Sequence, residues 1–200
     1  VSNQEETHAQ RVLSFNSDGV TIGTKNDNNE ADDGIIAWAW KAGGAPTATN
    51  DNTSGAMDAN SVSVNDTLQS SYTPSGSPSI YPKKMSVNTA GGFSIIQYAK
   101  NATAGATVPH GLSQAPEMII VKDLGADNNW MVYHKYSGNG NTHDSEDYYL
   151  SLDQTIAATD SDTRWNDTVP SSSVVTLGGS GHVNGPGGPD YIMYCWHSVT

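Results

Sequence analysis

Cysteine, positive charge and long apolar runs are all scarce in this sequence. Its 200 residues contain one cysteine, Cys195, which excludes an internal disulfide framework and a zinc site built from several cysteines. Because Cys195 lies inside the apolar run Tyr191–Trp196, we expect a buried, unreactive thiol. No apolar stretch approaches the ~20 residues of a membrane span, and no signal-peptide pattern opens the chain. The chain begins at Val1 rather than methionine, which indicates a processed or partial piece of something longer.

Positive charge is outweighed by negative charge. Lysine and arginine total 9 against 21 aspartates and glutamates, which gives a formal net charge of −12. Phosphate backbones and anionic membranes repel so acidic a chain, so we expect no nucleic-acid partner and no membrane insertion. The same charge favours solubility, which is its simplest role.

The residues that are present favour strands. Hydrophobic residues make up 36% of the chain, beside 20 glycines and 9 prolines, so turns take a large share. The central stretch holds three short apolar runs, Phe93–Tyr98, Met118–Lys122 and Trp130–Tyr133, each closed by turn residues. Counting such runs gives roughly eight to ten strands and no convincing helix, a number suited to a jelly-roll or concanavalin-like sandwich. We therefore predict an all-β fold with an extended N-terminal arm and linker.

One strand–loop–strand pattern occurs twice. Val20–Gly23 leads through a polar loop into Ile35–Trp40, and Val175–Gly178 leads through another into Tyr191–Trp196. The glycines at 23 and 178 are 155 positions apart, and the tryptophans at 40 and 196 are 156 apart. This spacing, the length of a domain, indicates an array of repeats in which one unit is complete and one is partial.

The pattern divides the chain into three parts. Residues 1–44 are expected to form an arm and the closing strands of a preceding partial repeat, and residues 91–200 the main sandwich. Residues 45–90 lack regular patterning, apart from strand-like pieces at Val62–Val64 and Lys83–Val87. A long structureless loop is uncommon inside a compact domain, so we predict that 45–90 is an extended linker along the surface or against a neighbouring subunit.

Six phrases of the sequence, taken in order, are characteristic of one family. They are Trp38–Gly44, Lys84–Asn88, Gly92–Tyr98, His110–Lys122, Trp130–His134 and Trp165–Thr168. Together they resemble a tandemly repeated β-sandwich domain of tail-fibre and other virion proteins of bacteriophages, especially those of marine cyanobacteria and pelagic bacteria. The resemblance runs from about Val20 to Trp196. Two departures are that Ala39 stands where the family often has cysteine, and that the linker is longer than usual.

The resemblance implies a concanavalin-like fold, a place in the virion and no catalytic motif. It also implies that Trp38–Gly44 closes one repeat and leads into the next. We expect a non-enzymatic phage structural protein, a tail-fibre or appendage domain for host attachment, with other copies of itself (a trimer), other virion proteins and a host surface glycan as partners. Two alternatives stay open: a capsid-surface decoration protein, and a carbohydrate-binding module of a secreted enzyme.

Two tryptophans are candidates for sugar contact. Trp130 follows two asparagines at a strand start, and Trp165 lies in a turn beside Asn166 and Asp167. An exposed indole ring can stack on the C–H face of a sugar while neighbouring amides and carboxylates bind hydroxyls. The alternative is that both rings cap the edges of the sandwich. The other tryptophans lie on predicted strands, where packing in the core or between repeats is expected: Trp38, Trp40 and Trp196.

Acidic loops are candidates for Ca²⁺, although solvation of the loop is the simpler interpretation. Five oxygen-bearing side chains fall within seven residues: Asp27, Asn28, Glu30, Asp32 and Asp33. Their spacing is not that of an EF-hand. A weaker candidate set is Asp160, Asp162 and Asp167. The histidines are scattered without zinc-ligand spacing, and His110, between proline and glycine, is expected to hydrogen-bond its own turn.

No enzyme motif is present. Gly-x-Ser-x-Gly does not occur, and the glycine cluster around Ser180 lacks the strand-to-helix turn that a serine nucleophile needs. Glycosidase carboxylates pair in space rather than in sequence, and the first candidates for such a pair are Asp144, Glu146 and Asp147.

Overall fold

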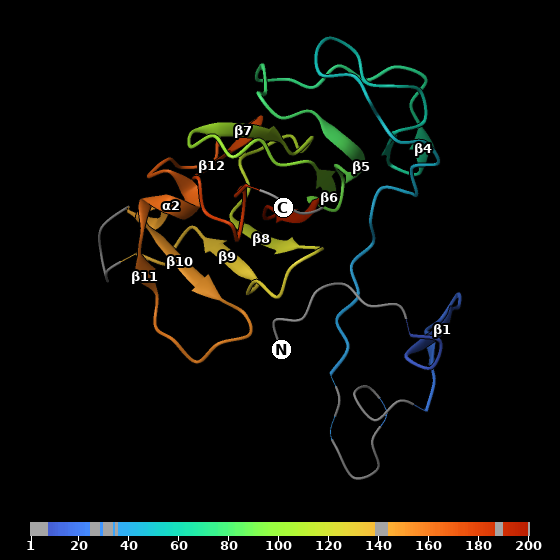
Figure 1. The fold of residues 1–200 in the computed structure, drawn as a ribbon. Helices are drawn as coiled ribbons and strands as arrows, with labels where there is room; N and C mark the ends of the chain where they lie inside the picture. Colours follow the sequence, from blue (N-terminus) through green and yellow to red (C-terminus); the bar gives the residue numbers. More distant parts are fainter. Residues whose placement is uncertain are drawn as a thin grey trace. The chain divides into compact units, whose positions relative to one another are not determined.

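The structure, a computed structural model, describes residues 8–24, 29, 34, 36–138, 144–186 and 190–199. These residues belong to two units, one within Glu5–Trp40 and one that begins at Lys41 and continues to the C-terminal end (Figure 1). Each unit is described by itself below. Among the described residues no helix is long and apolar enough to cross a membrane.

The N-terminal unit contains a hairpin of β1 (Val12–Phe15) and β2 (Val20–Ile22). The strands are antiparallel, with Val12 opposite Ile22, Phe15 opposite Val20 and a register shift between Val12 and Ser14. Every residue of both strands is exposed, and the Phe15 side chain is 87% exposed. Among the described residues of this unit nothing buries either face of the hairpin, and an isolated two-stranded hairpin is marginally stable in water.

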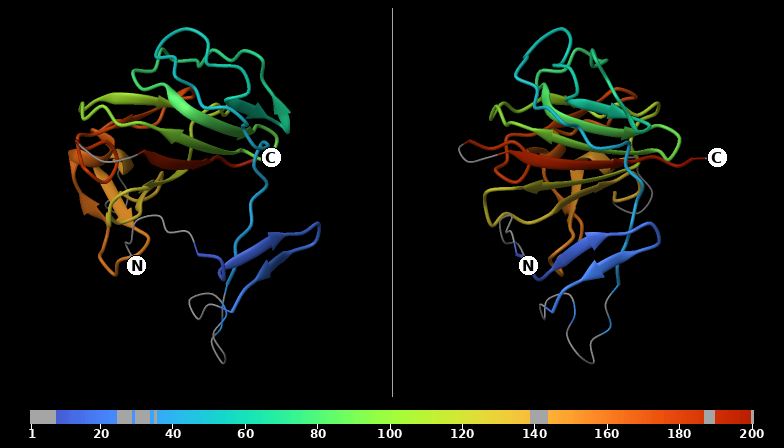
Figure 2. Two further views of the ribbon diagram at one scale, coloured as in Figure 1. Left: turned by 45° about the vertical axis from the view of Figure 1, so that its right-hand side comes forward. Right: turned by 90° about the vertical axis from the view of Figure 1, so that its right-hand side faces the viewer.

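A large, mostly antiparallel sheet forms one layer of the second unit (Figures 1 and 2). Its strand order is β11-β10-β9-β8-β13-β6-β5-β3-β4. In chain order these strands are β3 (Val62–Val64), β4 (Thr67–Leu68), β5 (Pro82–Asn88), β6 (Phe93–Tyr98), β8 (Met118–Asp123), β9 (Met131–His134), β10 (Tyr148–Ser151), β11 (Thr159–Asp160) and β13 (Tyr191–Trp196). The pair β3–β5 is parallel. Strand β13 lies in the middle, paired antiparallel to β6 on one side and to β8 on the other.

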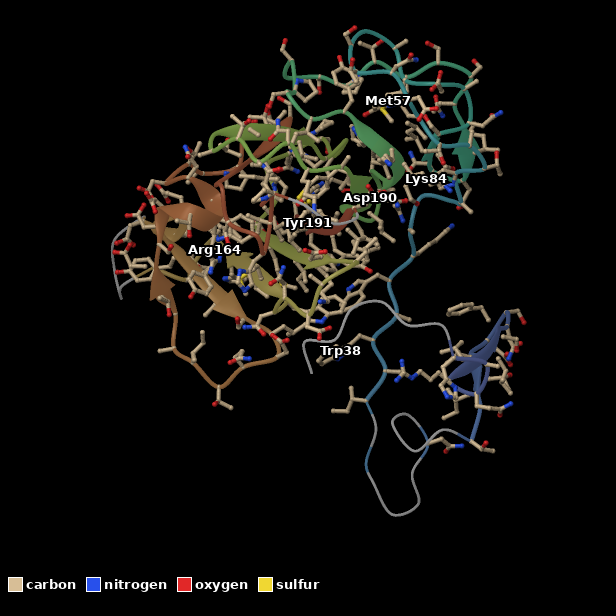
Figure 3. All side chains as sticks on the ribbon, viewed as in Figure 1. Trp38, Met57, Lys84, Arg164, Asp190 and Tyr191 are labelled. Atoms are coloured by element: carbon tan, nitrogen blue, oxygen red, sulfur yellow. The ribbon has the colours of Figure 1, made fainter. Side chains whose placement is uncertain are left out.

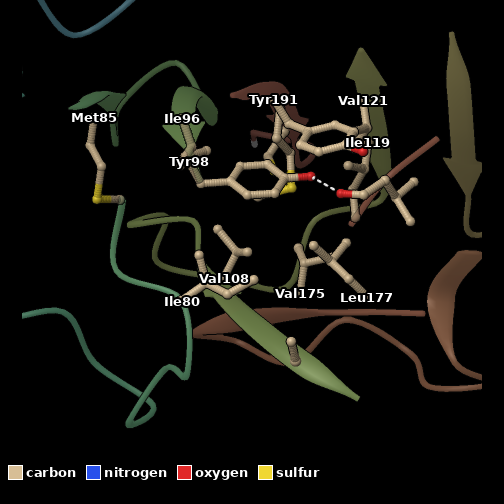
Figure 4. Packing of buried hydrophobic residues seen from close by; sticks show 14 of the residues in the cluster. Ile80, Met85, Ile96, Tyr98, Val108, Ile119, Val121, Val175, Leu177 and Tyr191 are labelled. Atoms are coloured by element: carbon tan, nitrogen blue, oxygen red, sulfur yellow. Dashed lines mark hydrogen bonds between the residues drawn. The ribbon is translucent and has the colours of Figure 1, made fainter. Parts of the chain in front are cut away.

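The second layer is a two-stranded antiparallel sheet of β7 (Ala106–Pro109) and β12 (Val174–Leu177). Buried side chains of this small sheet, such as Val108 and Leu177, face buried side chains of the large sheet, such as Tyr98 and Ile119 (Figure 4). The Tyr98 hydroxyl donates a hydrogen bond of 2.7 Å to the carbonyl of Val183, so the one polar atom of that ring is satisfied inside the core. The prediction of an all-β sandwich is confirmed, whereas the finer concanavalin-like topology stays a prediction.

Burial alternates along β13. Tyr191, Met193 and Cys195 are almost fully buried, and the residues between them are half-buried, as expected for a strand of an antiparallel sheet that packs one face on the core. Burial raises the pKa of the Cys195 thiol, which disfavours the reactive thiolate. The expectation of a buried cysteine is confirmed, and its low reactivity stays a prediction.

The segment 45–90 is part of the sandwich and not a linker. It contains β3, β4 and β5, and it contributes Met57, Val62 and Met85 to the core, each at most 2% exposed. Polar side chains satisfy its irregular backbone: Asn50 Nδ2 donates to the carbonyls of Asn52 and Pro82, and Asn50 Oδ1 accepts from the Asp58 N–H. The boundary expected at residue 90 therefore moves to residue 40.

Two local expectations also change. The segment Ile36–Trp40 is not paired as a strand among the described residues, and the side chains of Trp38 (Figure 3) and Trp40 are 71% and 50% exposed. The turn expected at Arg164–Asp167 begins with a helical turn, α2 (Asp162–Trp165), which Asn166 ends in the left-handed conformation at φ 53°. Trp196, by contrast, stacks on Phe93 with ring centroids 5.0 Å apart, as expected for a packing residue.

Candidate functional site

Three connections meet around Trp130, at the end of the sheet where β8 ends and β9 begins. Asn128 Nδ2 donates a 2.8 Å hydrogen bond to the carbonyl of Gly181, in the connection before β13. The Trp130 N–H donates to Asp153 Oδ1 at 3.2 Å, and Gln154 Nε2 donates to Asn129 Oδ1 at 3.1 Å. We call the residues Asn128, Asn129, Trp130, Asp153 and Gln154 the Trp130 surface.

Buried charges at the end of β8 hold the connection that carries Trp130. Lys122 is 3% exposed, and its ammonium group donates to the carbonyls of Ala126 at 3.0 Å and Asn128 at 2.6 Å. The neighbouring Asp123 carboxylate accepts from the Gly125 N–H at 2.9 Å and from Asn128 Nδ2 at 3.0 Å. Burial lowers the pKa of Lys122, and nearby carboxylates, Asp123 first, oppose that shift. A loop held from beneath in this way presents its side chains in a fixed arrangement.

The role of Lys122 and Asp123 was missed by the sequence analysis. A lysine at the end of an apolar run predicts a solvent-facing strand terminus, because lysine is seldom fully buried without a partner. The available signal was the pair itself, a lysine and an aspartate that directly follow four apolar residues.

The prediction of sugar contact at Trp130 depends on how exposed its side chain is. Its side chain is half-buried, and so are those of Asn128, Asn129 and Asp153, while Gln154 is exposed. The surface therefore combines part of an aromatic ring with amide and carboxylate groups, which suits hydroxyl-rich ligands. Glycan binding at Trp130 stays a prediction.

The expectation of an exposed ring at Trp165 is wrong. Its side chain is 1% exposed, and its ring meets the Tyr133 ring edge-on with centroids 5.9 Å apart. The neighbouring Arg164 (Figure 3) lies over the Tyr149 ring at 4.6 Å, so α2 is packed onto β10. Asn166 and Asp167 both have positive φ angles, 53° and 44°, and they form the turn that ends α2. A buried indole cannot stack on a sugar, so Trp165 loses the role proposed for it. Glycan contact by Asn166 and Asp167, which are half-buried and exposed, stays a prediction.

Carboxylates gather where η1 (Ser145–Asp147), β10 and β11 meet. The Ser161 N–H donates to the carbonyl of Asp147, and Tyr148 is paired with Asp160 across the strands. Desolvation raises the pKa of Asp147, and the negative charges of Asp167 and of the other acidic groups raise it further. The candidate glycosidase carboxylates and the weaker candidate metal set thus share one edge of the sheet.

Nothing in this acidic edge is organised for a metal ion. Within the ranges that the structure describes, no group of three histidine, cysteine, aspartate or glutamate side chains is placed to hold one. The Ca²⁺ candidates Asp27, Asn28, Glu30, Asp32 and Asp33 lie outside the described residues, so that prediction is neither supported nor opposed.

His110 has the local role that its position indicated. Its ring is fully buried, and Nδ1 accepts a 3.1 Å hydrogen bond from the Leu112 N–H. The expectation that His110 bonds its own turn is confirmed.

The fold and the loops define the class: an all-β sandwich with an amide- and aromatic-bearing surface at one end. Comparison of the sequence with models of known families identifies the family to which the chain belongs. The model of a domain of unknown function, DUF7483, matches the chain twice, over residues 1–79 and 78–200, and the chain belongs to this family. No curated protein and no solved structure matches it.

Proposed function

We propose that the chain is a non-enzymatic structural domain of a bacteriophage virion, which serves in a tail fibre or similar appendage to attach the particle to its host. The observation that carries the proposal is repetition, because one family model matches the chain twice, over residues 1–79 and 78–200. The junction of the two matches lies inside the unit that begins at Lys41, so the repeat is offset from the structural unit. Appendages are built economically by repeating one stable domain, and stacked repeats give length without a new fold. The phrases from Trp38 to Thr168 that resemble phage virion proteins support the same location.

The Trp130 surface supports an adhesive role. A half-buried ring beside fixed amides gives weak, reversible contact with a host surface glycan. Weak contacts become strong when several copies bind together, as they do in a trimeric fibre. The trimer follows from the resemblance to fibres, and the partners proposed are other copies of the chain, other virion proteins and the glycan.

Antibody labelling of intact virions, viewed by electron microscopy, tests the location. Label on tail appendages is the expected result. Label spread over the head overturns the appendage assignment in favour of the alternative, a capsid-surface decoration protein. Purified chain that binds empty capsids, and neither cells nor glycans, overturns it in the same way.

Trp130→Ala tests the adhesive surface. Removing the ring is expected to weaken binding to host cells or to a glycan array about fivefold per site, because an aromatic contact contributes about 1 kcal/mol. Tyr136→Ala is the matched control, since it removes another aromatic side chain, 74% exposed, outside the Trp130 surface. Equal binding by the two variants, with unchanged circular dichroism, removes Trp130 from the binding site.

A further inference from the structure

Residues 8–40 expose several large apolar side chains. Phe15 on the hairpin and Ile36 and Trp38 beyond it are 87%, 79% and 71% exposed. Scattered exposed apolar residues are ordinary, but several on one short segment indicate a surface that another element covers.

A backbone contact of this segment has a counterpart in the sandwich. The Gly23 N–H donates to the Arg11 carbonyl at 2.9 Å, and the Gly178 N–H donates to the Arg164 carbonyl at 2.8 Å. A Cβ on either glycine would lie 2.3 Å from a backbone oxygen of the residue before that arginine, closer than any side chain tolerates. Glycine is therefore required at both positions for the same reason.

A turn is duplicated as well. The Asn16 N–H donates to the Gly19 carbonyl at 2.8 Å just before β2, and the Ser171 N–H donates to the Val174 carbonyl at 3.0 Å at the start of β12. Both donors and both acceptors are 155 positions apart, the offset that also relates Gly23 to Gly178. Strand β2 thus has the local geometry of β12, although the two strands have different neighbours.

We infer that β2 and Ile36–Trp40 are the last two strands of a second sandwich of the same kind, with β2 in the place of β12 and Ile36–Trp40 in the place of β13. In the complete sandwich β12 pairs with β7, and β13 lies between β6 and β8. The occupant of the exposed surface is accordingly another copy of this domain, which supplies the equivalents of β6, β7 and β8.

The aligned tryptophans fix the register of this pairing. Trp40 takes the place of Trp196, which lies opposite Phe93 and Met118. Ala39 takes the place of Cys195, which lies opposite Ser94 and Ile119. Ile36, Trp38 and Trp40 then occupy the half-buried face of the strand, whereas Ala37 and Ala39 point into the core, as Met193 and Cys195 do.

The connection between the two sandwiches is short. Gly43 is anchored on the complete sandwich: its N–H donates to Ser86 Oγ at 3.0 Å, and its carbonyl accepts from Ser63 Oγ at 2.7 Å. Only Lys41 and Ala42 separate this anchor from the end of the proposed strand. Each domain of such a series completes the one before it.

A fusion protein tests the pairing. A second copy of residues 41–153 is placed before the full chain. Arg11 and Arg164 are 153 positions apart, two fewer than Gly23 and Gly178, so residue 1 matches residue 154. Every variant of the fusion also carries Ala37→Met. Residue 37 takes the place of Met193, so the larger side chain fills the same volume of the core. Cysteines are introduced as Ala39→Cys in the chain and Ser94→Cys in the added copy. The expected result is a disulfide between them, seen by mass spectrometry under non-reducing conditions.

The matched control moves one cysteine along the same strand, with Gln97→Cys in the added copy in place of Ser94→Cys. Gln97 lies opposite Ile192 in the complete sandwich, three positions out of register, and no disulfide is expected. A second measurement is amide hydrogen exchange of residues 36–40, which we expect to slow at least a hundredfold in the fusion relative to the original chain. Disulfides in both versions or in neither, or unchanged exchange, overturn the inference. Neither readout depends on virions or glycans, so its failure is distinct from failure of the proposed function.

Discussion

At the scale of the single residue, His110 shows how a buried polar group makes the stability of the fold depend on pH. Because Nδ1 accepts from the Leu112 N–H, the proton of the neutral ring lies on Nε2, which donates to the Ser171 carbonyl at 3.2 Å. Both nitrogens are satisfied only in the neutral ring. Burial lowers the pKa of His110 to about 4; the Ser171 carbonyl opposes the shift and the charge of His197 adds to it.

This shift predicts that the sandwich loses stability in mild acid. The folded pKa is about 4 and that of an unfolded histidine about 6.5, so between these values the unfolded chain binds the proton and the folded chain does not. The contribution is complete above pH 6.5 and is lost as the pH falls toward 4, by about 3 kcal/mol in all. Urea denaturation at a series of pH values measures it.

His110→Gln is the control for this prediction. The variant is expected to be less stable at neutral pH but to depend less steeply on pH between 4 and 6.5. A residual slope is expected from His182, whose pKa burial also lowers. An unchanged slope in the variant would assign the effect to other groups.

Single residues also show where sequence patterns are insufficient. The burial of Cys195 was predictable because alternating large side chains surround it over six residues. The burial of Trp165 was not, because α2 is only four residues long and polar residues follow it. A segment that short has no periodicity, and only the Tyr133 ring, 32 positions away in the chain, explains where the indole goes.

At the scale of the element, the segment Gly43–Gly44 illustrates how a stretch of chain without regular structure is held against a strand, here β5. A Cβ on Gly43 would lie 1.9 Å from the Val87 carbonyl oxygen and 2.2 Å from the Val87 carbonyl carbon. Both atoms belong to the backbone of β5, which pairs on both sides, so they cannot retreat as a flexible side chain would. The close approach also allows the Ser86 hydroxyl to donate to the Gly44 carbonyl at 2.6 Å.

Gly43→Ala is therefore expected to lower the free energy of unfolding by about 1–3 kcal/mol, the usual cost of overpacking a buried contact. Gly181→Ala is the matched control, because a Cβ there meets nothing within 4 Å. Thermal or urea denaturation of the two variants beside the parent measures the difference. Equal stability of the two variants would show that Gly43–Gly44 is not held against β5.

Elements with strong alternation could be predicted, and elements supported by polar loops could not. Phe93–Tyr98 and Met118–Lys122 were expected as strands and are found as β6 and β8 within one residue of those bounds. Between residues 45 and 80 the backbone is satisfied by side chains such as Asn50, which leaves little periodicity to detect. Small polar residues therefore indicated a linker where the chain contributes to the core.

At the scale of the whole molecule, the strands β3 and β5 decide how far the cooperative unit reaches. Val62 and Met85 are opposite each other in the parallel pair and belong to the same buried cluster as Ile96 and Met193. Residues that share one core lose their protection together when the domain unfolds. A linker that only lay along the surface would open independently of the sandwich, with a lower free energy of opening.

Native-state hydrogen exchange distinguishes these two behaviours. The amides of β3 and of Lys83–Asn88 in β5 are expected to exchange with the same free energy of opening as those of β6 and β13, and to respond equally to low concentrations of denaturant. The exposed segment 36–40 serves as the internal control, since its amides are expected to exchange fast in the isolated chain. If β3 and β5 exchanged as fast as that segment, the sandwich would be complete from β6 onward. Gly43 would then have no rigid strand to rest on, so the short connection between successive domains would lose its anchor.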